Sequence, residues 1–262
     1  MNPTLTPVTP ERISYDEQGY AIFRGVLDQA LIAEARDHVD WLTRRHPDLR
    51  PEHLGHTLVA SDPFWVRLVS DDRLLDVAAQ FIGPNIALFA SHYISKPPGD
   101  GQAVLWHQDG SYWPLDPMEV VTLWLAVDDS TPENGCMRVI PHTHTLGLQQ
   151  MKQRTDVPNV LSSGIDAAFV DEAQAVDVVL KAGDVSVHHP NIVHGSNANT
   201  SDRRRCGLTI RYIPTSTRIT APNWPCAFLL RGSPVPGVND YIARPRYVPG
   251  EHLPFRGCES WT

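Results

Sequence analysis

His107 and Asp109 stand two positions apart in the aromatic stretch WHQDGSYW, residues 106–113. In a β-strand, residues i and i+2 point to the same side, so these two side chains project together while Gln108 points away. A neutral imidazole beside a carboxylate supplies two of the three protein ligands of a non-haem ferrous site, which combines two histidines, one carboxylate and open positions. The pair therefore predicts a metal site that needs one more histidine from a neighbouring strand.

Three histidines are candidates for the third ligand. They follow a strand-like VSV in VHHPNIVHGSN, residues 187–197, and are His188, His189 and His194. A lone histidine in a core is more often structural than metal-binding, but three within seven residues weaken that interpretation. Their spacing does not choose among them. Three arginines follow at residues 203–205, and an arginine beside a ferrous site is the natural bidentate partner of a dicarboxylate cosubstrate.

The N-terminal part of the sequence predicts two helices and a strand. Residues 1–10 are rich in Pro and Thr, and we expect them to be irregular. Residues 20–26 are predicted to form a strand, and residues 28–45 a helix capped by its first residue, an aspartate. A second helix is predicted over residues 73–82, because a Gly-Pro pair follows it. The first helix should pack on a sheet through Leu31, Ile32, Ala35, Val39 and Leu42.

From residue 85 onward the sequence consists of short β-rich runs separated by Pro, Gly, Asn and Asp. The runs cover residues 86–95, 104–113, 120–129, 137–141, 176–189 and 207–214. This pattern predicts a mainly β fold with flanking helices, arranged as a sandwich or barrel. Residues 145–173 lack periodicity and are predicted to be an insertion or a lid over one mouth of the barrel. The Pro-rich tail after Pro214 is predicted to be irregular.

Composition narrows the class of protein. The 262 residues, 42% of them hydrophobic, suffice for one sizeable core, so we expect a single domain over 1–262. A net charge of -8 offers no basic field for nucleic acid. The first residues do not resemble a signal peptide, no run reaches the roughly 18 apolar residues of a membrane span, and the four cysteines form no C-x-x-C pair. We expect a cytoplasmic monomer or homodimer with reduced thiols that binds neither nucleic acid nor membrane.

Several motifs in sequence order resemble one family, the phytanoyl-CoA dioxygenase group of Fe(II)/2-oxoglutarate oxygenases. They are DEQGYAIFRGVL, WHQDGSYW, TLWLAVDDSTPENGCMRVIPHTH, HGSNANTSDRRRCGLTIRYIP and FLLRG. H-x-D alone is common by chance, but its combination with W-x-A, ENGC and HGS in this order is specific. The resemblance implies a double-stranded β-helix (jelly-roll, cupin-like) core, and it implies Fe(II), 2-oxoglutarate and O2 as cofactors.

The resemblance also assigns roles to particular residues. The family's distal histidine lies in an H-G-S motif, which implies His194 as the third metal ligand. The family's 2-oxoglutarate arginine follows that histidine by eleven positions, which implies Arg205. Trp124 and Ser196 would line the cosubstrate pocket. His142 replaces a glycine of the family pattern, and we expect it to face solvent rather than the site.

The reaction implied by the resemblance is the hydroxylation, or a related oxidation, of a C–H bond in a small-molecule metabolite, with release of succinate and CO2. An aspartate at position 109 leaves no vacancy for a halide, which favours hydroxylation over halogenation. Tyr112 and Trp113 are candidates for an apolar substrate wall, and His188 and Arg211 for polar contacts at the mouth; core packing and hydrogen bonding within the sheet are the alternatives. No glycine-rich phosphate loop supports a CoA thioester as substrate.

Two other functions fit the same fold. A cupin-like metal-dependent oxygenase or isomerase would use the metal without 2-oxoglutarate and would have no use for Arg205. A non-catalytic binding protein could keep the fold without turnover, but the intact H-x-D pair, the distal histidine and the arginine argue against it.

Overall fold

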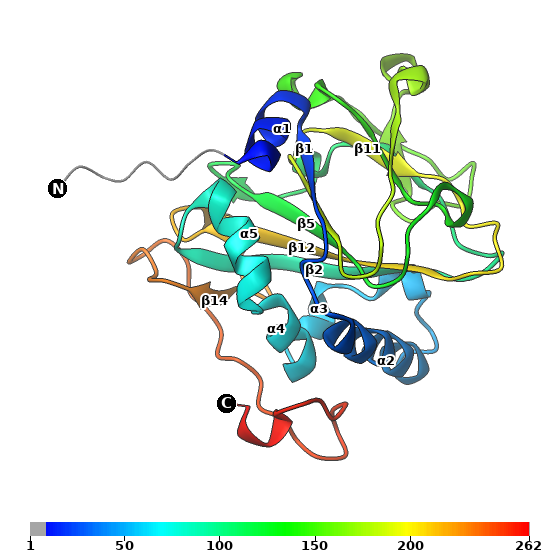
Figure 1. Cartoon of the computed structure of the whole chain (residues 1–262). Coiled ribbons are helices and arrows are strands. Elements are labelled where there is room, and N and C mark those ends of the chain that lie inside the picture. The colour runs from blue at the N-terminus through cyan, green and yellow to red at the C-terminus, as the bar shows by residue number, and fades with distance from the viewer. Residues whose placement is uncertain (1–8, 262) are drawn as a thin grey trace.

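The computed structural model describes residues 9–261, and two antiparallel sheets form its centre (Figure 1). The larger sheet has the order β1 (Tyr20–Phe23), β10 (Val185–His188), β5 (Val121–Ala126), β12 (Arg205–Pro214), β2 (Ile86–Lys96) and β14 (Phe228–Arg231). The smaller sheet has the order β3 (Val104–His107), β11 (Val193–Ser196), β6 (Met137–Ile140) and β9 (Val176–Val178). The predicted mainly β fold, with a jelly-roll core and flanking helices, is confirmed.

The central strands of the larger sheet direct alternate side chains to its two faces. In β5, Val121, Leu123 and Leu125 belong to the main hydrophobic core, whereas Trp124 packs against the smaller sheet. In β12, Leu208, Ile210 and Tyr212 belong to that same core. Because successive residues of a strand point to opposite faces, the polar side chains between these positions face the interior between the two sheets. This interior face carries the candidate functional residues.

Helices cover the other face of the larger sheet (Figure 1). The described helices are α1 (Pro10–Gln18), α2 (Gln29–Arg45), α3 (His56–Val59), α4 (Pro63–Val69) and α5 (Asp72–Ile82). The predicted helix capped by Asp28 is confirmed, because its carboxylate accepts a hydrogen bond from Leu31 N at 3.0 Å and its predicted apolar face is buried. The predicted helix over residues 73–82 is also confirmed and begins one residue earlier.

The sequence did not predict three of these helices. Residues 1–8 lie outside the described part of the chain, but Pro10 begins α1, with Thr9 as its cap, where we expected irregular structure. α4 has only seven residues and buries six of them, so it shows no polar stripe from which a helical period could be read. α3 is a single turn of four residues.

Two strand predictions and the prediction of an irregular tail need correction. The strand predicted over residues 20–26 ends at Phe23. The run over residues 104–113 leaves the sheet after His107 and continues as a turn. The tail after Pro214, predicted to be irregular, contributes β13 (Arg218–Ile219), which pairs with β4 (Leu115–Asp116), and β14, an edge strand of the larger sheet. A strand as short as β14 can form at the sheet edge because its backbone N–H and C=O groups pair with those of β2.

Residues 145–173 form a hairpin of β7 (Met151–Gln153) and β8 (Ser163–Ile165) with short 3-10 turns around it. β8 lies against β3, since a side chain at Gly164 would contact Leu105. The lid function predicted for this segment stays a prediction. Among the described helices, none has the length and apolar character needed to cross a membrane.

Candidate metal centre

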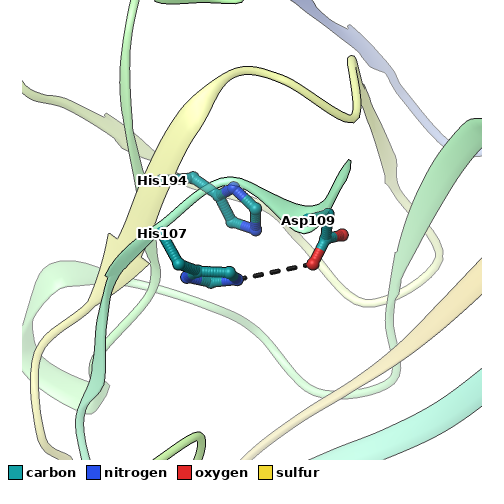
Figure 2. A group of neighbouring side chains, drawn as sticks. All are labelled: His107, Asp109 and His194. Atoms are coloured by element: carbon teal, nitrogen blue, oxygen red, sulfur yellow. Dashed lines mark ion pairs between the residues drawn. The ribbon is translucent and has the colours of Figure 1, made fainter. Parts of the chain in front are cut away.

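His107, Asp109 and His194 lie together at one end of the smaller sheet (Figure 2). His107 is the last residue of β3 and pairs directly with His194 of β11, so the two rings stand side by side with centroids 4.1 Å apart. One ligand atom from each of the three residues lies within 4.8 Å of the other two. His107 Nε2 is 3.4 Å from Asp109 Oδ1, and all three side chains are buried. This is the arrangement of two histidines and one carboxylate that suits a ferrous ion.

Asp109 reaches the site from a turn rather than from a strand. Gln108 keeps an extended backbone, with φ -121° and ψ 120°, so the expected i, i+2 relation between His107 and Asp109 survives beyond the strand end. The chain then turns at residues 109–111, where Tyr112 N donates to Asp109 O at 3.0 Å. Gln108 points away from the triad, as expected, and its amide nitrogen donates to Asn191 O at 2.7 Å.

Both candidate histidine ligands are held in the tautomer that a metal needs. His107 Nδ1 donates to Leu105 O at 2.8 Å, and His194 Nδ1 donates to Ile192 O at 3.1 Å. With its proton on Nδ1, each imidazole presents an unprotonated Nε2 to the centre of the triad. Burial, followed by the neighbouring histidines, holds the pKa of His194 well below its usual range. The ring is therefore neutral at physiological pH, which is the form that binds metals.

Asp109 has one oxygen toward the histidine ligands and one toward a second set of polar groups. Its Oδ2 atom is 3.6 Å from His188 Nε2 and 3.6 Å from Arg211 Nη2, and it accepts no hydrogen bond. Burial alone would raise the pKa of Asp109, but the charge of Arg211 and the close approach of His107 and His188 outweigh burial and hold the pKa well below its usual range. Asp109 is therefore anionic, which is the form that a metal ligand requires.

Of the three histidine candidates, only His194 joins the triad. His188 is buried beside it, with ring centroids 4.7 Å apart, and both of its ring nitrogens lack a partner. Burial lowers the pKa of His188. His189 follows the strand end and points elsewhere, with its ring 5.9 Å from that of Tyr15. His142 is exposed, and its Nδ1 donates to Glu17 O at 2.8 Å.

Arg205 lines the same cavity as the triad and is 2% exposed. Its Nε donates to Gly135 O at 3.0 Å, its Nη2 donates to Ser196 Oγ at 3.3 Å, and its guanidinium carbon lies 5.3 Å from the Trp124 ring centroid. Burial lowers the pKa of Arg205 to about 10, so the group keeps its charge at neutral pH. Arg205 thus contacts both of the other residues that the family resemblance assigned to the cosubstrate, Trp124 and Ser196.

Two glycines shape the surroundings of Arg205. Gly135, in the ENGC turn, has φ 78° and ψ 53°, a left-handed conformation that favours glycine and that turns its carbonyl toward Arg205. Gly207 lies two residues along β12, and the ring of Trp124 fills the space where a Cβ would be. The two preceding arginines lie outside the cavity: Arg203 is exposed, and Arg204 bonds Asp128 at 2.8 Å.

Lys96 is a residue of this region that the sequence did not single out. It ends β2, is 0% exposed, and its Nζ donates to Ser196 Oγ at 2.7 Å. Burial, and secondly the nearby charge of Arg205, lower the pKa of Lys96 to about 5. A lysine at the end of a strand normally faces solvent, so no local pattern indicates that this one is buried behind the hydroxyl of Ser196.

A larger cavity of about 390 Å³ adjoins the triad and shares Asp109 and Arg211 with the cavity around it. Two of the predicted substrate residues, Tyr112 and Trp113, line this larger cavity, and His188 lines the other. Three further lining residues, His56 of α3, His92 of β2 and Trp224 of the C-terminal tail, were not predicted because they come from segments far apart in the sequence.

A jelly-roll core that carries two histidines and a carboxylate at one end is the architecture of non-haem iron oxygenases. Residues 15–207 match the family model "Phytanoyl-CoA dioxygenase (PhyH)". The chain therefore belongs to the phytanoyl-CoA dioxygenase family, as its motifs predicted. Membership brings with it the cofactor set of ferrous iron, 2-oxoglutarate and O2, and the triad is a suitable ligand set for the metal.

Two curated relatives illustrate the match. Phytanoyl-CoA dioxygenase domain-containing protein 1 of Bos taurus is 31% identical over 183 residues, which cover 68% of this chain and 62% of that protein. Phytanoyl-CoA dioxygenase 1 of Oryza sativa subsp. japonica is 29% identical over 176 residues, which cover 67% of this chain and 62% of that protein. The chain thus spans 62% of the length of each relative.

Solved structures share the fold over nearly the whole chain. The apo form of the non-heme monooxygenase ThoJ superposes with a TM-score of 0.76 at 26% identity, covering 95% of this chain and 91% of that one. The epimerase SnoN, solved with Fe3+, alpha ketoglutarate and nogalamycin RO, superposes with a TM-score of 0.64 at 23% identity, covering 91% and 94%. The second likeness concerns the fold alone.

Proposed function

We propose that this protein is an Fe(II)- and 2-oxoglutarate-dependent oxygenase that hydroxylates an unactivated C–H bond of a small-molecule metabolite and releases succinate and CO2. In this proposal His107, Asp109 and His194 hold the iron. Arg205 holds the far carboxylate of 2-oxoglutarate, and the side chains in contact with it complete the pocket.

The observation that carries the proposal is the shared cavity of the triad and Arg205. A dicarboxylate that chelates a metal through one end needs a cation at a fixed distance for the other end. Arg205 is a buried, charged guanidinium whose position is set by Gly135 O and Ser196 Oγ. Guanidinium groups recognise carboxylates by paired hydrogen bonds, so a metal triad and Arg205 in one cavity match the two ends of 2-oxoglutarate.

The fit of a metal rests on the donor set. The triad offers two neutral imidazole nitrogens and one carboxylate, and Asp109 Oδ2 is buried without a hydrogen bond. Iron with 2-oxoglutarate and O2 supplies the oxidising power for C–H cleavage, which side chains do not provide. The protein's part is to orient the ligands and to exclude water. Val160 and Leu161 line both cavities and are suited to keep the space beside the triad dry.

Asp109 supports one part of the proposal on the type of oxidation. A carboxylate in that place occupies the coordination position that a halide would need, which supports hydroxylation over halogenation. Among solved structures of the same fold, SnoK is described as a carbocyclase and SnoN as an epimerase. Product mass separates these reactions, because hydroxylation adds one oxygen atom, desaturation or ring closure removes two hydrogen atoms, and epimerisation leaves the mass unchanged.

The proposal is tested by replacing Arg205 with Ala and measuring 2-oxoglutarate consumption and ferrous iron binding in parallel. We expect consumption to fall to background while iron stoichiometry is retained. Arg203→Ala, two positions away on the exposed surface, is the matched control and keeps wild-type consumption. If Arg205→Ala turns over 2-oxoglutarate normally, the cosubstrate assignment is wrong, and a cupin-like oxygenase or isomerase without 2-oxoglutarate is the better description.

We also propose that the protein works in the cytoplasm, as a monomer or homodimer, on a small molecule. Its four cysteines are all free and buried, which suits a reducing compartment. Size-exclusion chromatography with light scattering tests the oligomeric state, and a larger assembly would contradict this part of the proposal.

A further inference from the structure

The larger cavity beside the triad has aromatic walls. Phe89 and Trp224 stack with ring centroids 4.6 Å apart and an interplanar angle of 12°, and Trp113 meets Phe89 edge-on at 6.0 Å. All three rings line the cavity of about 390 Å³, a volume suited to a small metabolite. Flat aromatic faces favour a ring or another compact apolar body as the occupant.

Arg211 is the only arginine or lysine among the described residues that line this cavity. Its Nη1 donates to His92 Nδ1 at 3.0 Å, and His92 Nε2 in turn donates to His56 Nδ1 at 3.1 Å. Burial, and next the charge of Arg211, lower the pKa of both histidines. These two histidines are therefore neutral, and Arg211 is the lining residue with a permanent positive charge. The acidic residue Glu52 is neutralised by Arg50, with contacts at 3.1 and 3.2 Å.

One edge of the Arg211 guanidinium has no hydrogen-bond partner among the described residues. Its Nη1 is used by His92 and Thr209, at 3.0 and 3.1 Å. Its Nε is buried without a partner, and its Nη2 is 3.6 Å from Asp109 Oδ2, beyond hydrogen-bond length. Nε and Nη2 form the edge that pairs with both oxygens of a carboxylate. The Trp113 ring, 5.1 Å from the guanidinium carbon, holds the group from the side.

Charge balance points the same way. Asp109 is the one acidic side chain that the structure places within 4.0 Å of Arg211 among the described residues. When a divalent metal takes Asp109 as a ligand, that carboxylate compensates the metal, and Arg211 is left as a buried cation that lacks a full counter-charge. A buried charge without a partner is costly, so the loaded site favours an occupant that brings an anion of its own.

We propose that the substrate is a small organic monocarboxylate with a compact apolar body, and that its carboxylate docks on the Nε/Nη2 edge of Arg211. This inference rests on the proposed function, since it takes the triad to hold a metal and Arg205 to hold 2-oxoglutarate. The apolar body lies against Trp113, Phe89 and Trp224, beside the triad. Arg211 is then the specificity-determining residue for the substrate, as Arg205 is for the cosubstrate.

The wild-type protein provides the first test, by isothermal titration calorimetry with no turnover. The protein is loaded with Zn(II) and saturated with 2-oxoglutarate, and then titrated with benzoate, phenylacetate, 3-phenylpropionate or cyclohexanecarboxylate, each against its primary amide. We expect at least one acid to bind about ten-fold or more tightly than its amide. We also expect that acid to bind more weakly to metal-free protein, in which Asp109 still faces Arg211. If no acid is preferred over its amide, the proposal is wrong.

Variants then locate the binding site. Arg211→Gln should weaken the preferred acid about ten- to hundred-fold and leave its amide unchanged, because a charged hydrogen-bond partner is lost. Arg211→Lys keeps the charge but loses the paired N–H donors of the guanidinium. Its affinity for the acid should fall between those of wild type and Arg211→Gln. Arg203→Gln removes an exposed charge and should match wild type. If the acid binds Arg211→Gln as tightly as wild type, the assignment of Arg211 is wrong, and so it is if excess 2-oxoglutarate displaces the acid, because the acid then occupies the cosubstrate site.

The same titrations separate the two proposals. Failure of Zn(II) and 2-oxoglutarate to bind would contradict the proposed function itself. Normal binding of both, with acids and amides indistinguishable, would contradict only the substrate class. If Arg211→Gln does not fold, the comparison of acid with amide on the wild-type protein still decides the proposal.

Discussion

Two arginines, Arg205 and the less deeply buried Arg211, face the interior from the same strand, β12. Each lies on a tryptophan ring, yet their hydrogen bonding differs. Arg205 donates to Gly135 O and Ser196 Oγ, so its position is set by groups that are present with or without a ligand. Arg211 has an unpartnered Nε, and its Nη2 faces Asp109, a residue that a metal would claim.

This difference shows that the Arg205 end of the site is held in place by protein groups before any ligand binds, whereas the Arg211 end is not. A cosubstrate is the same in every turnover, so a rigid pocket around Arg205 lowers the cost of binding it. The cavity around Arg211 leaves donors free, and an incoming molecule must supply their acceptors. In physical terms the first arginine is preorganised, and the second is completed by its ligand.

The largest expected effect concerns two neighbouring histidines, His194 of the proposed metal triad and His188 beside it. His194→Ala removes a metal ligand, and we expect ferrous iron affinity to fall by about two orders of magnitude or more, whereas His188→Ala changes it by less than about ten-fold. Anaerobic iron titration of both variants measures this. The reverse result, with iron lost from His188→Ala and kept in His194→Ala, would mean that the metal centre lies on the Arg211 side.

A smaller effect is expected from Gly207→Ala, because this substitution affects only the surroundings of Arg205. The new Cβ would collide with the Trp124 ring on which Arg205 lies. Overpacking of this kind costs roughly 1–3 kcal/mol of stability, and we expect about ten-fold weaker 2-oxoglutarate binding with unchanged binding of acids at Arg211.

Gly147→Ala is the control for that variant, because nothing lies within 4 Å of a Cβ at that position. Thermal unfolding and 2-oxoglutarate titration should leave Gly147→Ala at wild-type values. Equal 2-oxoglutarate affinity in wild type and Gly207→Ala would show that the Trp124 wall does not set the position of Arg205.

The last expected effect is a pH dependence of stability at Lys96, behind the preorganised end. Burial and Arg205 lower the pKa of Lys96 from 10.5 to about 5 in the folded protein. Between these values the unfolded chain binds one proton more than the folded protein, so stability rises with pH. Lys96→Met has no ionisable group at this position, so its stability lacks this contribution to the pH dependence. The free energy of unfolding of wild type relative to the variant should therefore rise by up to about 1.4 kcal/mol per pH unit.

Urea unfolding of wild type and Lys96→Met between about pH 6 and pH 9 measures that difference. Parallel pH profiles for the two proteins would show that Lys96 keeps its proton in the folded state. Arg205 would then share its surroundings with a second charge.

The sequence predicts the strands and the long capped helices well because each has its own period or cap. Alternation marks β12, an apolar β-rich run marks β5, and Asp28 marks the start of α2. The short helix α4 was missed because it is buried nearly all round, and β14 because its four residues follow a Pro-rich stretch. Such short elements depend on contacts with distant segments, which local patterns do not report.

Some residues of the candidate site could also be predicted from the sequence, and others could not. The spacing of His107 and Asp109 predicts a shared face without any knowledge of the fold, and the motif order adds His194 and Arg205. Lys96 and the aromatic cavity walls could not be predicted, since their roles arise from burial and from proximity between segments far apart in the chain. The turn at Asp109 was also missed, although the extended backbone of Gln108 preserves the predicted geometry.

The most direct test of the account is an anaerobic titration of the metal-free protein with ferrous iron and then 2-oxoglutarate, followed by visible absorption. The account predicts a weak charge-transfer band at one iron per chain, and predicts that Asp109→Ala and Arg205→Ala both lose the band, the first through loss of iron and the second through loss of 2-oxoglutarate. Iron binding without the band would contradict the cosubstrate role of the Arg205 pocket. Absence of iron binding would mean that the triad is only a buried cluster of polar residues.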